Sequence, residues 1–166
     1  NEIYLPSIPN KEGYVSDGCW YDNYGNPYYQ NTYVILYDTT TNFTAKYINI
    51  ETITTMAMDQ YYINNITSEE TQFYYFSCTA GDSYTVSWLD SYVGSSELNE
   101  LVTNEGLSGT NGNVIVSIYS YDGSQRFISY EDNGPVSFTA SETGLIVIEV
   151  VPYYSGGAGY YAVKVN

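Results

Sequence analysis

Short runs in which apolar and polar residues alternate recur along most of this chain, and a period of two predicts β-strands. In the run SYTVSWLD, Tyr84, Val86 and Trp88 fall on one face, so we expect that face to point toward a core. From residue 71 onward, the predicted strands are 71–78, 83–90, 114–121, 125–130, 135–140, 145–151 and 159–165. Upstream of these, 32–37 and 43–53 have the same β-branched and aromatic character.

Turn-forming residues separate these runs. The triplet Asp122-Gly123-Ser124 stands between 114–121 and 125–130, and its Asp-Gly pair suits the positive φ values of a tight hairpin turn. The turn-prone stretch 38–42 separates 32–37 from 43–53, which predicts a second hairpin. Many short strands joined by such turns indicate an all-β protein, an antiparallel β-sandwich of the jelly-roll-like kind.

One stretch, 95–106, breaks the alternation and predicts one short helix. The serines at 95 and 96 suit a helix N-terminus, where Glu97 and Glu100 complement the helix dipole, and Gly106 suits the end of the helix. Three apolar residues fall on one face of it: Leu98, Leu101 and Val102.

Prolines and glycines interrupt every run in residues 1–30. Such a segment cannot sustain long regular elements, so we predict an extended N-terminal arm with loops. Residues 31–166 are then predicted to form a single β-sandwich, which is a usual size for one domain.

Tyrosine is unusually frequent, with 22 residues against five phenylalanines. Much of the apolar area therefore carries a hydroxyl that needs a partner, which favours surfaces and interfaces. The chain has 4 basic and 19 acidic side chains, for a net charge of −15. This charge repels phosphate, and no apolar run is long enough to span a bilayer, so we expect neither a nucleic-acid partner nor membrane insertion. Calcium, which prefers oxygen ligands, is the one metal that fits this composition.

The sequence contains no histidine. This excludes Ser-His-Asp and Cys-His catalysis and the common zinc sites. A pair of carboxylates acting on a glycosidic bond is the catalytic alternative that remains. Most carboxylates, such as Asp82 and Asp122, lie in predicted turns, where solvation explains them. We therefore predict a protein that is not an enzyme and requires no cofactor, with calcium as the one candidate.

The two cysteines, Cys19 and Cys78, lie far apart in the sequence. We predict a disulfide between them, which would stabilise the fold by about 4 kcal/mol, and the alternative is two buried free thiols. Asn42 and Asn65 begin Asn-X-Thr sequons and are the predicted glycosylation sites. Together with a chain that starts at Asn1 rather than at methionine, these features predict an exported protein, extracellular or at the cell surface after removal of a signal peptide.

The segment 17–26 concentrates oxygen ligands, glycines and aromatic rings in one predicted loop. This segment has two functional interpretations, a calcium site and an aromatic platform. The structural alternative is a turn-rich loop whose rings simply pack on the sandwich. A calcium site would use Asp17, Asp22, Asn23 and Asn26. An aromatic platform for sugar rings would use Trp20, Tyr21 and Tyr24.

Adjacent tyrosines recur along the chain, and neighbours in a strand point to opposite faces. One ring of each pair is therefore expected to face outward, unless the N-terminal arm covers it. The pairs are 28–29, 61–62, 74–75, 153–154 and 160–161. Tyr28 and Tyr29 follow the loop directly and complete the predicted binding residues.

Four segments have the spacing of strands and turns that one family of small sandwiches shows. They are FYYF leading to AGDSYTV (73–86), the strand and turn 117–123, VSFTA before Thr143-Gly144, and the closing 156–165. Through them, residues 61–165 resemble the pre-peptidase C-terminal domain appended to secreted bacterial and archaeal proteases. The resemblance implies a non-catalytic β-sandwich that binds polymers such as collagen or polysaccharide, aids secretion or stabilises a neighbour.

Two functions follow from these features. The first is a self-assembling surface or filament subunit, in which the N-terminal arm or an edge strand of one copy completes the sheet of the next. Tyrosine-rich, lysine-poor faces without edge charges to block pairing favour this homopolymer. The alternative is a module of a secreted hydrolase that binds polysaccharide or another extracellular polymer.

Overall fold

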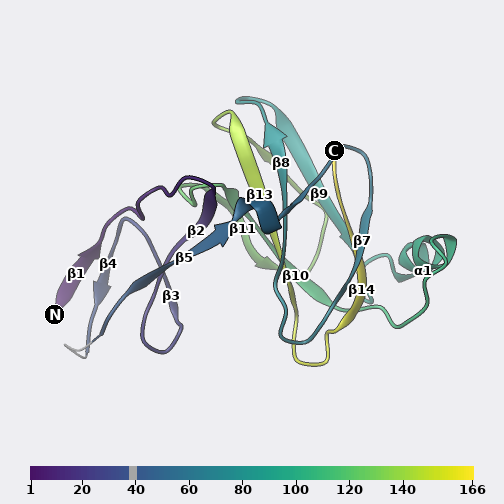
Figure 1. The fold of residues 1–166 in the computed structure, drawn as a ribbon, viewed down its shortest axis with the longest axis horizontal. Helices are drawn as coiled ribbons and strands as arrows, with labels where there is room; N and C mark the ends of the chain where they lie inside the picture. The colour runs from purple at the N-terminus through teal and green to yellow at the C-terminus, as the bar shows by residue number, and fades with distance from the viewer. Residues whose placement is uncertain (38–40) are drawn as a thin grey trace. The chain divides into compact units, whose positions relative to one another are not determined.

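The alternating strands fold into two separate units. The computed structural model describes residues 1–37 and 41–166 (Figure 1). The first unit holds Asn1–Ile53 and Tyr119–Arg126, and the second holds Thr54–Ile118 and Phe127–Asn166. The predicted domain boundary at residue 31 is therefore wrong, because residues 31–53 belong to the first unit and the sandwich begins near Thr54.

The second unit is a β-sandwich of two sheets. One sheet has the strand order β11 (Arg126–Glu131), β10 (Val114–Ser120), β13 (Gly144–Pro152), β8 (Gln72–Cys78) and β6 (Thr54–Thr55). The other has the order β12 (Val136–Thr139), β9 (Ser83–Leu89), β14 (Gly159–Val165) and β7 (Tyr62–Ile66). Strand β9 pairs antiparallel with β12 and β14, as do β14 with β7 and β13 with β8, whereas β6 runs parallel to β8. The predicted all-β sandwich, the strands from residue 71 onward and the Asp-Gly hairpin are confirmed.

Inward side chains from both sheets fill the space between them. Trp88 and Val86 are almost completely buried, and Tyr84 packs against the same cluster, so the predicted inward face of β9 is confirmed. Removing each large apolar side chain from water contributes about 1.5–3 kcal/mol. Other fully buried members of this core are Ile66, Phe76, Val114, Val116, Ile118, Ile148 and Val163.

Two buried tyrosines show how the core satisfies their hydroxyl groups. The hydroxyl oxygens of Tyr74 and Tyr161 lie 2.6 Å apart, and Tyr161 also donates to Gln72 Oε1 at 2.5 Å. Burial raises the pKa of both phenols, because the phenolate would lose its hydration there. Their sequence neighbours Tyr75 and Tyr160 remain partly exposed, as strand alternation predicts.

The predicted helix is confirmed as α1 (Ser95–Asn104), which packs on β14. Leu98 and Val102 are buried against Ala162, while Gly94 rather than a serine occupies the N-cap position and no side chain caps the helix. Within the described part of the chain, no helix is long and apolar enough to cross a membrane.

In its described residues, the first unit contains strands β1 to β5 instead of the expected arm. One sheet has the order β3 (Pro27–Tyr29), β2 (Tyr14–Tyr21) and β5 (Thr44–Asn49), and β5 leads into a 3-10 turn at Ile50–Thr52. The other pairs β1 (Glu2–Leu5) with β4 (Thr32–Ile35). The predicted hairpin of 32–37 with 43–53 is therefore wrong, since β4 pairs with β1 and β5 pairs with β2. The turn expected at 38–42 lies partly outside the described residues.

Strand β2 contains Gly18 at an irregular point in its pairing with β5. The register of β2 against β5 shifts between Ser16 and Trp20, and Gly18 has a φ of 77°, which places a bulge at this glycine. A Cβ atom there would lie 2.3 Å from the carbonyl oxygen of Gly123. The backbone of the bulge therefore touches the backbone of the turn at Gly123. Next to this contact, Arg126 Nη2 donates a hydrogen bond of 2.9 Å to the carbonyl oxygen of Asp17.

Candidate functional site

Strands β1 and β4 make a two-stranded ribbon in the first unit (Figure 1), and several large apolar side chains on it are exposed. Tyr4 lies opposite Tyr33, and Glu2 lies opposite Ile35, so alternation puts these side chains on one face. The exposed fractions are 50% for Tyr4, 69% for Tyr33 and 64% for Ile35. The two tyrosine ring centroids are 5.0 Å apart. We call Tyr4, Tyr33 and Ile35 the ribbon face.

Both outer edges of this ribbon lack a neighbouring strand in the part of the chain that the structure describes. The N–H of Leu36 donates to the carbonyl oxygen of Asn1 at 2.7 Å, and Ile3 with Val34 is the next bonded pair of the ladder. The intervening peptide groups point outward, away from the partner strand. These outward groups belong to Glu2, Tyr4, Tyr33 and Ile35.

Polar contacts tie the inner end of the ribbon to strand β2. The N–H of Asn31 donates to the carbonyl oxygen of Leu5 at 2.7 Å, and its side-chain oxygen accepts from Ser7 Oγ at 2.8 Å. The N–H of Gln30 donates to the carbonyl oxygen of Gly18 at 2.8 Å. The sheet of β2 therefore positions the ribbon. Sequence reasoning missed β1, although the alternation in EIYL is the signal that could have revealed it.

The proposed calcium ligands at the tip of the 17–26 segment bond to one another. Asp22 Oδ1 accepts from the N–H groups of Tyr24 and Asn26 at 2.9 Å each, and Oδ2 accepts from Asn26 Nδ2 at 2.9 Å. The bond from the Asn26 side chain is the main cause that lowers the pKa of Asp22. Asn23 Oδ1 accepts from the N–H of Asn42 at 3.0 Å. These contacts close the tip as a polar turn.

Asp17, the fourth proposed ligand, is buried and has partners of its own. Its Oδ1 accepts from the N–H of Cys19 at 2.9 Å, and its Oδ2 accepts from the Tyr21 hydroxyl. In residues 1–37 and 41–166 no group of three or more Asp, Glu, His or Cys side chains could hold a metal ion. Calcium binding by Asp17, Asp22, Asn23 and Asn26 stays a prediction.

The proposed aromatic platform is only partly exposed. Tyr24 is 84% exposed, but Trp20 is partly buried and its Nε1 donates to the carbonyl oxygen of Pro6 at 2.8 Å. Tyr21 is partly buried as well, and its hydroxyl donates a hydrogen bond to Asp17 Oδ2. Two of the three rings therefore help to hold the first unit together, and Tyr24 alone presents most of its ring to solvent.

Tyr28 and Tyr29 point to opposite faces of β3, as their adjacency predicts. The ring of Tyr28 meets Phe43 edge to face, with centroids 5.5 Å apart. Tyr29 is 49% exposed, and the guanidinium of Arg126 lies 5.5 Å from its ring centroid. Tyr29 is thus the outward member of this pair.

Both cysteines are free and buried, so the predicted disulfide is not present and the alternative of two buried thiols holds. Cys19 belongs to the first unit, where Arg126 Nη2 lies 3.9 Å from its sulfur. Cys78 belongs to the second unit and its thiol donates to the carbonyl oxygen of Glu142 at 3.3 Å. Each thiol has its own polar contact. The wide separation of Cys19 and Cys78 in the sequence was therefore no indication of a disulfide bond.

The asparagines of both sequons are exposed. Asn42 precedes β5, and Asn65 lies on β7, an edge strand of the four-stranded sheet. Attachment of a glycan at either position stays a prediction, which mass spectrometry of the native protein would check.

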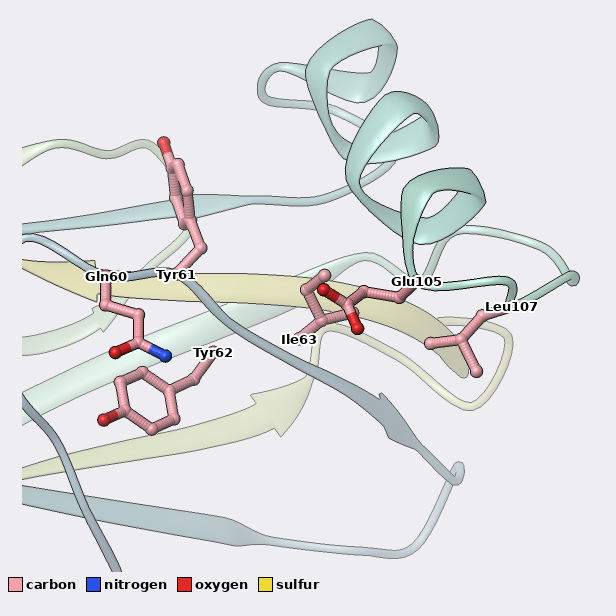
Figure 2. A pocket seen from close by; sticks show the side chains of 6 residues that line it. All are labelled: Gln60, Tyr61, Tyr62, Ile63, Glu105 and Leu107. Atoms are coloured by element: carbon pink, nitrogen blue, oxygen red, sulfur yellow. The ribbon is translucent and has the colours of Figure 1, made fainter.

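A surface groove of about 320 Å³ lies between β7 and the end of α1 (Figure 2). Figure 2 shows the side chains of Tyr61 and Tyr62 on opposite sides of the strand, with Gln60 beside the ring of Tyr62. Tyr62 is engaged by the fold, because its hydroxyl accepts from the N–H of Ala57 at 2.8 Å and its ring meets Tyr74 edge to face. Three further residues line the groove: Ile63, Glu105 and Leu107.

No family model matches this chain, and no curated protein matches it either. Among solved structures, the pre-peptidase C-terminal domain of a Bacillus anthracis collagenase is similar at 13% identity and a TM-score of 0.47, covering 69% of this chain and 94% of that domain. It is the kind of domain that residues 61–165 resemble in sequence.

Two PliG proteins, periplasmic inhibitors of g-type lysozyme, are also similar in structure. The protein from Salmonella Typhimurium has 14% identity and a TM-score of 0.45, and the one from Aeromonas hydrophila has 14% identity and a TM-score of 0.44. The similarity covers 69% of this chain and 96% of each inhibitor. Identities of 13–14% and TM-scores below 0.5 carry no information on the function of this chain.

Proposed function

We propose that this protein is a non-catalytic extracellular subunit that assembles with copies of itself by strand addition at the ribbon of β1 and β4. The observation that carries the proposal is a two-stranded ribbon with an exposed aromatic face and two open edges. An isolated ribbon of two strands is marginally stable in water, and a third strand relieves this. The exposed sequon asparagines are compatible with the extracellular location.

Nothing in the two strands blocks their edges. Proteins commonly protect an edge strand with lysine, proline or a bulge, and EIYL and TYVI contain neither lysine nor proline and pair in continuous register. Glu2 is the one charged side chain in these strands. The edges are therefore open to main-chain hydrogen bonds from another copy.

The geometry of the ribbon favours an open chain of subunits. One outer edge belongs to β1 and the other belongs to β4, so the contact that adds β4 of one copy to β1 of the next is head-to-tail. Such a contact leaves a free edge at each end and generates a filament unless the rotation closes a ring. The side chains of a strand added at the edge also bury part of the apolar area of the ribbon face. This burial stabilises the contact by about 25 cal/mol per Å² of apolar area removed from water.

The net charge of −15 opposes this assembly at low salt. At an ionic strength of about 0.15 M the Debye length falls to about 8 Å, which screens repulsion between the subunits but leaves the short hydrogen bonds intact. We therefore expect the polymers to grow with salt as well as with protein concentration.

Proline substitutions test the proposal at single peptide groups. The N–H groups of Tyr4 and Tyr33 point outward, so Tyr4→Pro and Tyr33→Pro each remove one outward donor without removing a bond between β1 and β4. Sedimentation velocity should show polymers for the unmodified chain and no polymers for either variant. Tyr24→Ala removes a still more exposed ring that lies away from the ribbon, and this variant should polymerise normally. A strictly monomeric unmodified chain at all salt concentrations would contradict the proposal.

A further inference from the structure

Four loops of the second unit surround a small pocket that the assembly described above does not use. It has a volume of about 140 Å³ and is lined by Tyr92, Asn113, Asp132 and Tyr153. These residues come from the loop after β9, the residue before β10, the β11–β12 loop and the β13–β14 loop. Segments far apart in sequence thus bring two aromatic rings, an amide and a carboxylate together.

Both rings lie largely at the surface, and that of Tyr153 meets the neighbouring ring of Tyr154 edge to face, with centroids 5.9 Å apart. Tyr92 is 81% exposed and Tyr153 is 51% exposed. A tyrosine exposed to this degree contributes little to a core, but it offers a partner an apolar face and a hydroxyl at low cost in side-chain entropy.

The two polar groups of the pocket have hydrogen-bonding capacity to spare. Asp132 Oδ1 accepts from Asn133 Nδ2 at 2.6 Å, and Oδ2 has no protein partner in the described part of the chain. The side-chain amide of Asn113 has no protein partner there either. A carboxylate that accepts and an amide that both donates and accepts can bind adjacent hydroxyl groups.

A buried carboxylate fixes the loop that carries Tyr92. Asp90 is fully buried, and its Oδ1 accepts from the N–H groups of Tyr92 and Val93 at 2.7 Å each. Its Oδ2 accepts from the N–H of Val114 at 3.1 Å, which joins this loop to the start of β10. Tyr92 is therefore held in place through its backbone while its ring stays in solvent.

Close backbone packing fixes the opposite wall of the pocket. The N–H of Tyr153 donates to the carbonyl oxygen of Asn113, and the N–H of Asn113 donates to that of Gly157, both at 2.9 Å. A Cβ atom at Gly157 would lie 2.6 Å from the carbonyl oxygen of Asn113, so only glycine permits this approach. A preorganised site loses little freedom when a ligand binds.

We propose that this pocket binds one neutral sugar ring of an extracellular glycan. The rings of Tyr92 and Tyr153 cover the C–H face of the sugar, while Asp132 and Asn113 bind its hydroxyl groups. Asp132 and the net charge of −15 exclude an anionic ligand, and a single carboxylate is too few for calcium. The pocket is smaller than the roughly 300–1,000 Å³ of drug-sized sites, which suits one ring rather than several.

Affinity electrophoresis of the full chain tests this assignment. Native gels would contain, in turn, a soluble β-glucan, a mannan, a galactan and, as an anionic control, a polyuronate, and each mobility would be divided by the mobility in a plain gel. Retardation by at least one neutral polysaccharide is expected. Tyr92→Ala and Tyr153→Ala should each weaken the apparent affinity by about tenfold, the factor that corresponds to the 1.4 kcal/mol expected for one aromatic contact.

Two further variants complete the test. Asp132→Asn keeps the size of the side chain and should also weaken binding, whereas Tyr121→Ala removes an exposed ring of the first unit and should leave binding unchanged. No retardation by any of the neutral polysaccharides, retardation by polyuronate alone, or unchanged retardation of a Tyr92→Ala/Tyr153→Ala double variant would overturn the proposal.

Discussion

The contact between Gly18 and Gly123 predicts a large effect from adding a single methyl group. Gly18→Ala places a side chain at a φ of 77°, which costs about 1–2 kcal/mol for an L-residue. Its Cβ atom would also lie 2.3 Å from the carbonyl oxygen of Gly123, and relieving such a clash costs a further ~1–3 kcal/mol. The expected loss in the free energy of unfolding of the first unit is therefore about 2–5 kcal/mol.

Gly25→Ala is the matched control. Gly25 has a φ of 83°, but a Cβ atom there would meet nothing within 4 Å, so only the conformational cost of about 1–2 kcal/mol applies. The difference between the two variants measures the backbone contact alone.

Hydrogen exchange in a urea series gives the required resolution. In Gly18→Ala, peptides from β2 should lose protection at clearly lower urea than in Gly25→Ala, while peptides from β13 in the second unit should change little. Equal loss of protection in the two variants would refute the inferred contact, and equal loss in β2 and β13 would refute the division into two units.

Three further predictions concern single side chains. Asp90→Ala leaves one buried and two part-buried N–H groups without their acceptor and should lower stability by about 3 kcal/mol in chemical denaturation. Since burial raises the pKa of Tyr161, the folded state keeps the phenol protonated and stability should fall as the pH rises above about 10; Tyr161→Phe should flatten this loss in a pH series of thermal unfolding. Burial alone would raise the pKa of Asp122, but hydrogen bonds from Ser124 and Ser120 lower it overall, so its contribution should be lost as the pH falls below 3.8, and Asp122→Asn should remove that dependence.

The sandwich was predictable because its signals are local. Alternation in runs such as SYTVSWLD indicates which side chains face a core, and the Asp-Gly pair at 122–123 indicates a turn. Both signals lie within a short stretch of sequence, so they can be read without knowing which strands pair. The pairing of β4 with β1 was not predictable in this way. The nearest suitable strand in sequence was β5, and sequence proximity favoured that incorrect hairpin.

The functional surfaces depend on contacts between segments far apart in sequence. The composition indicated exposed tyrosines, but the ribbon face requires the register that sets Tyr4 opposite Tyr33. Trp20 looked like a free ring because its bond to the carbonyl oxygen of Pro6 cannot be read from the pattern. The pocket of Tyr92 and Tyr153 was missed for the same reason, since four loops contribute one residue each.

Mixing the two proline variants tests assembly by strand addition most directly. Tyr4→Pro blocks the β1 edge and keeps the β4 edge, whereas Tyr33→Pro does the reverse, so neither can extend a chain. Sedimentation velocity of an equimolar mixture should show heterodimers that end there, and a small amount of either variant should shorten polymers of the unmodified chain. Polymers formed by either variant alone, or a mixture that remains monomeric while the unmodified chain polymerises, would contradict head-to-tail addition at the ribbon.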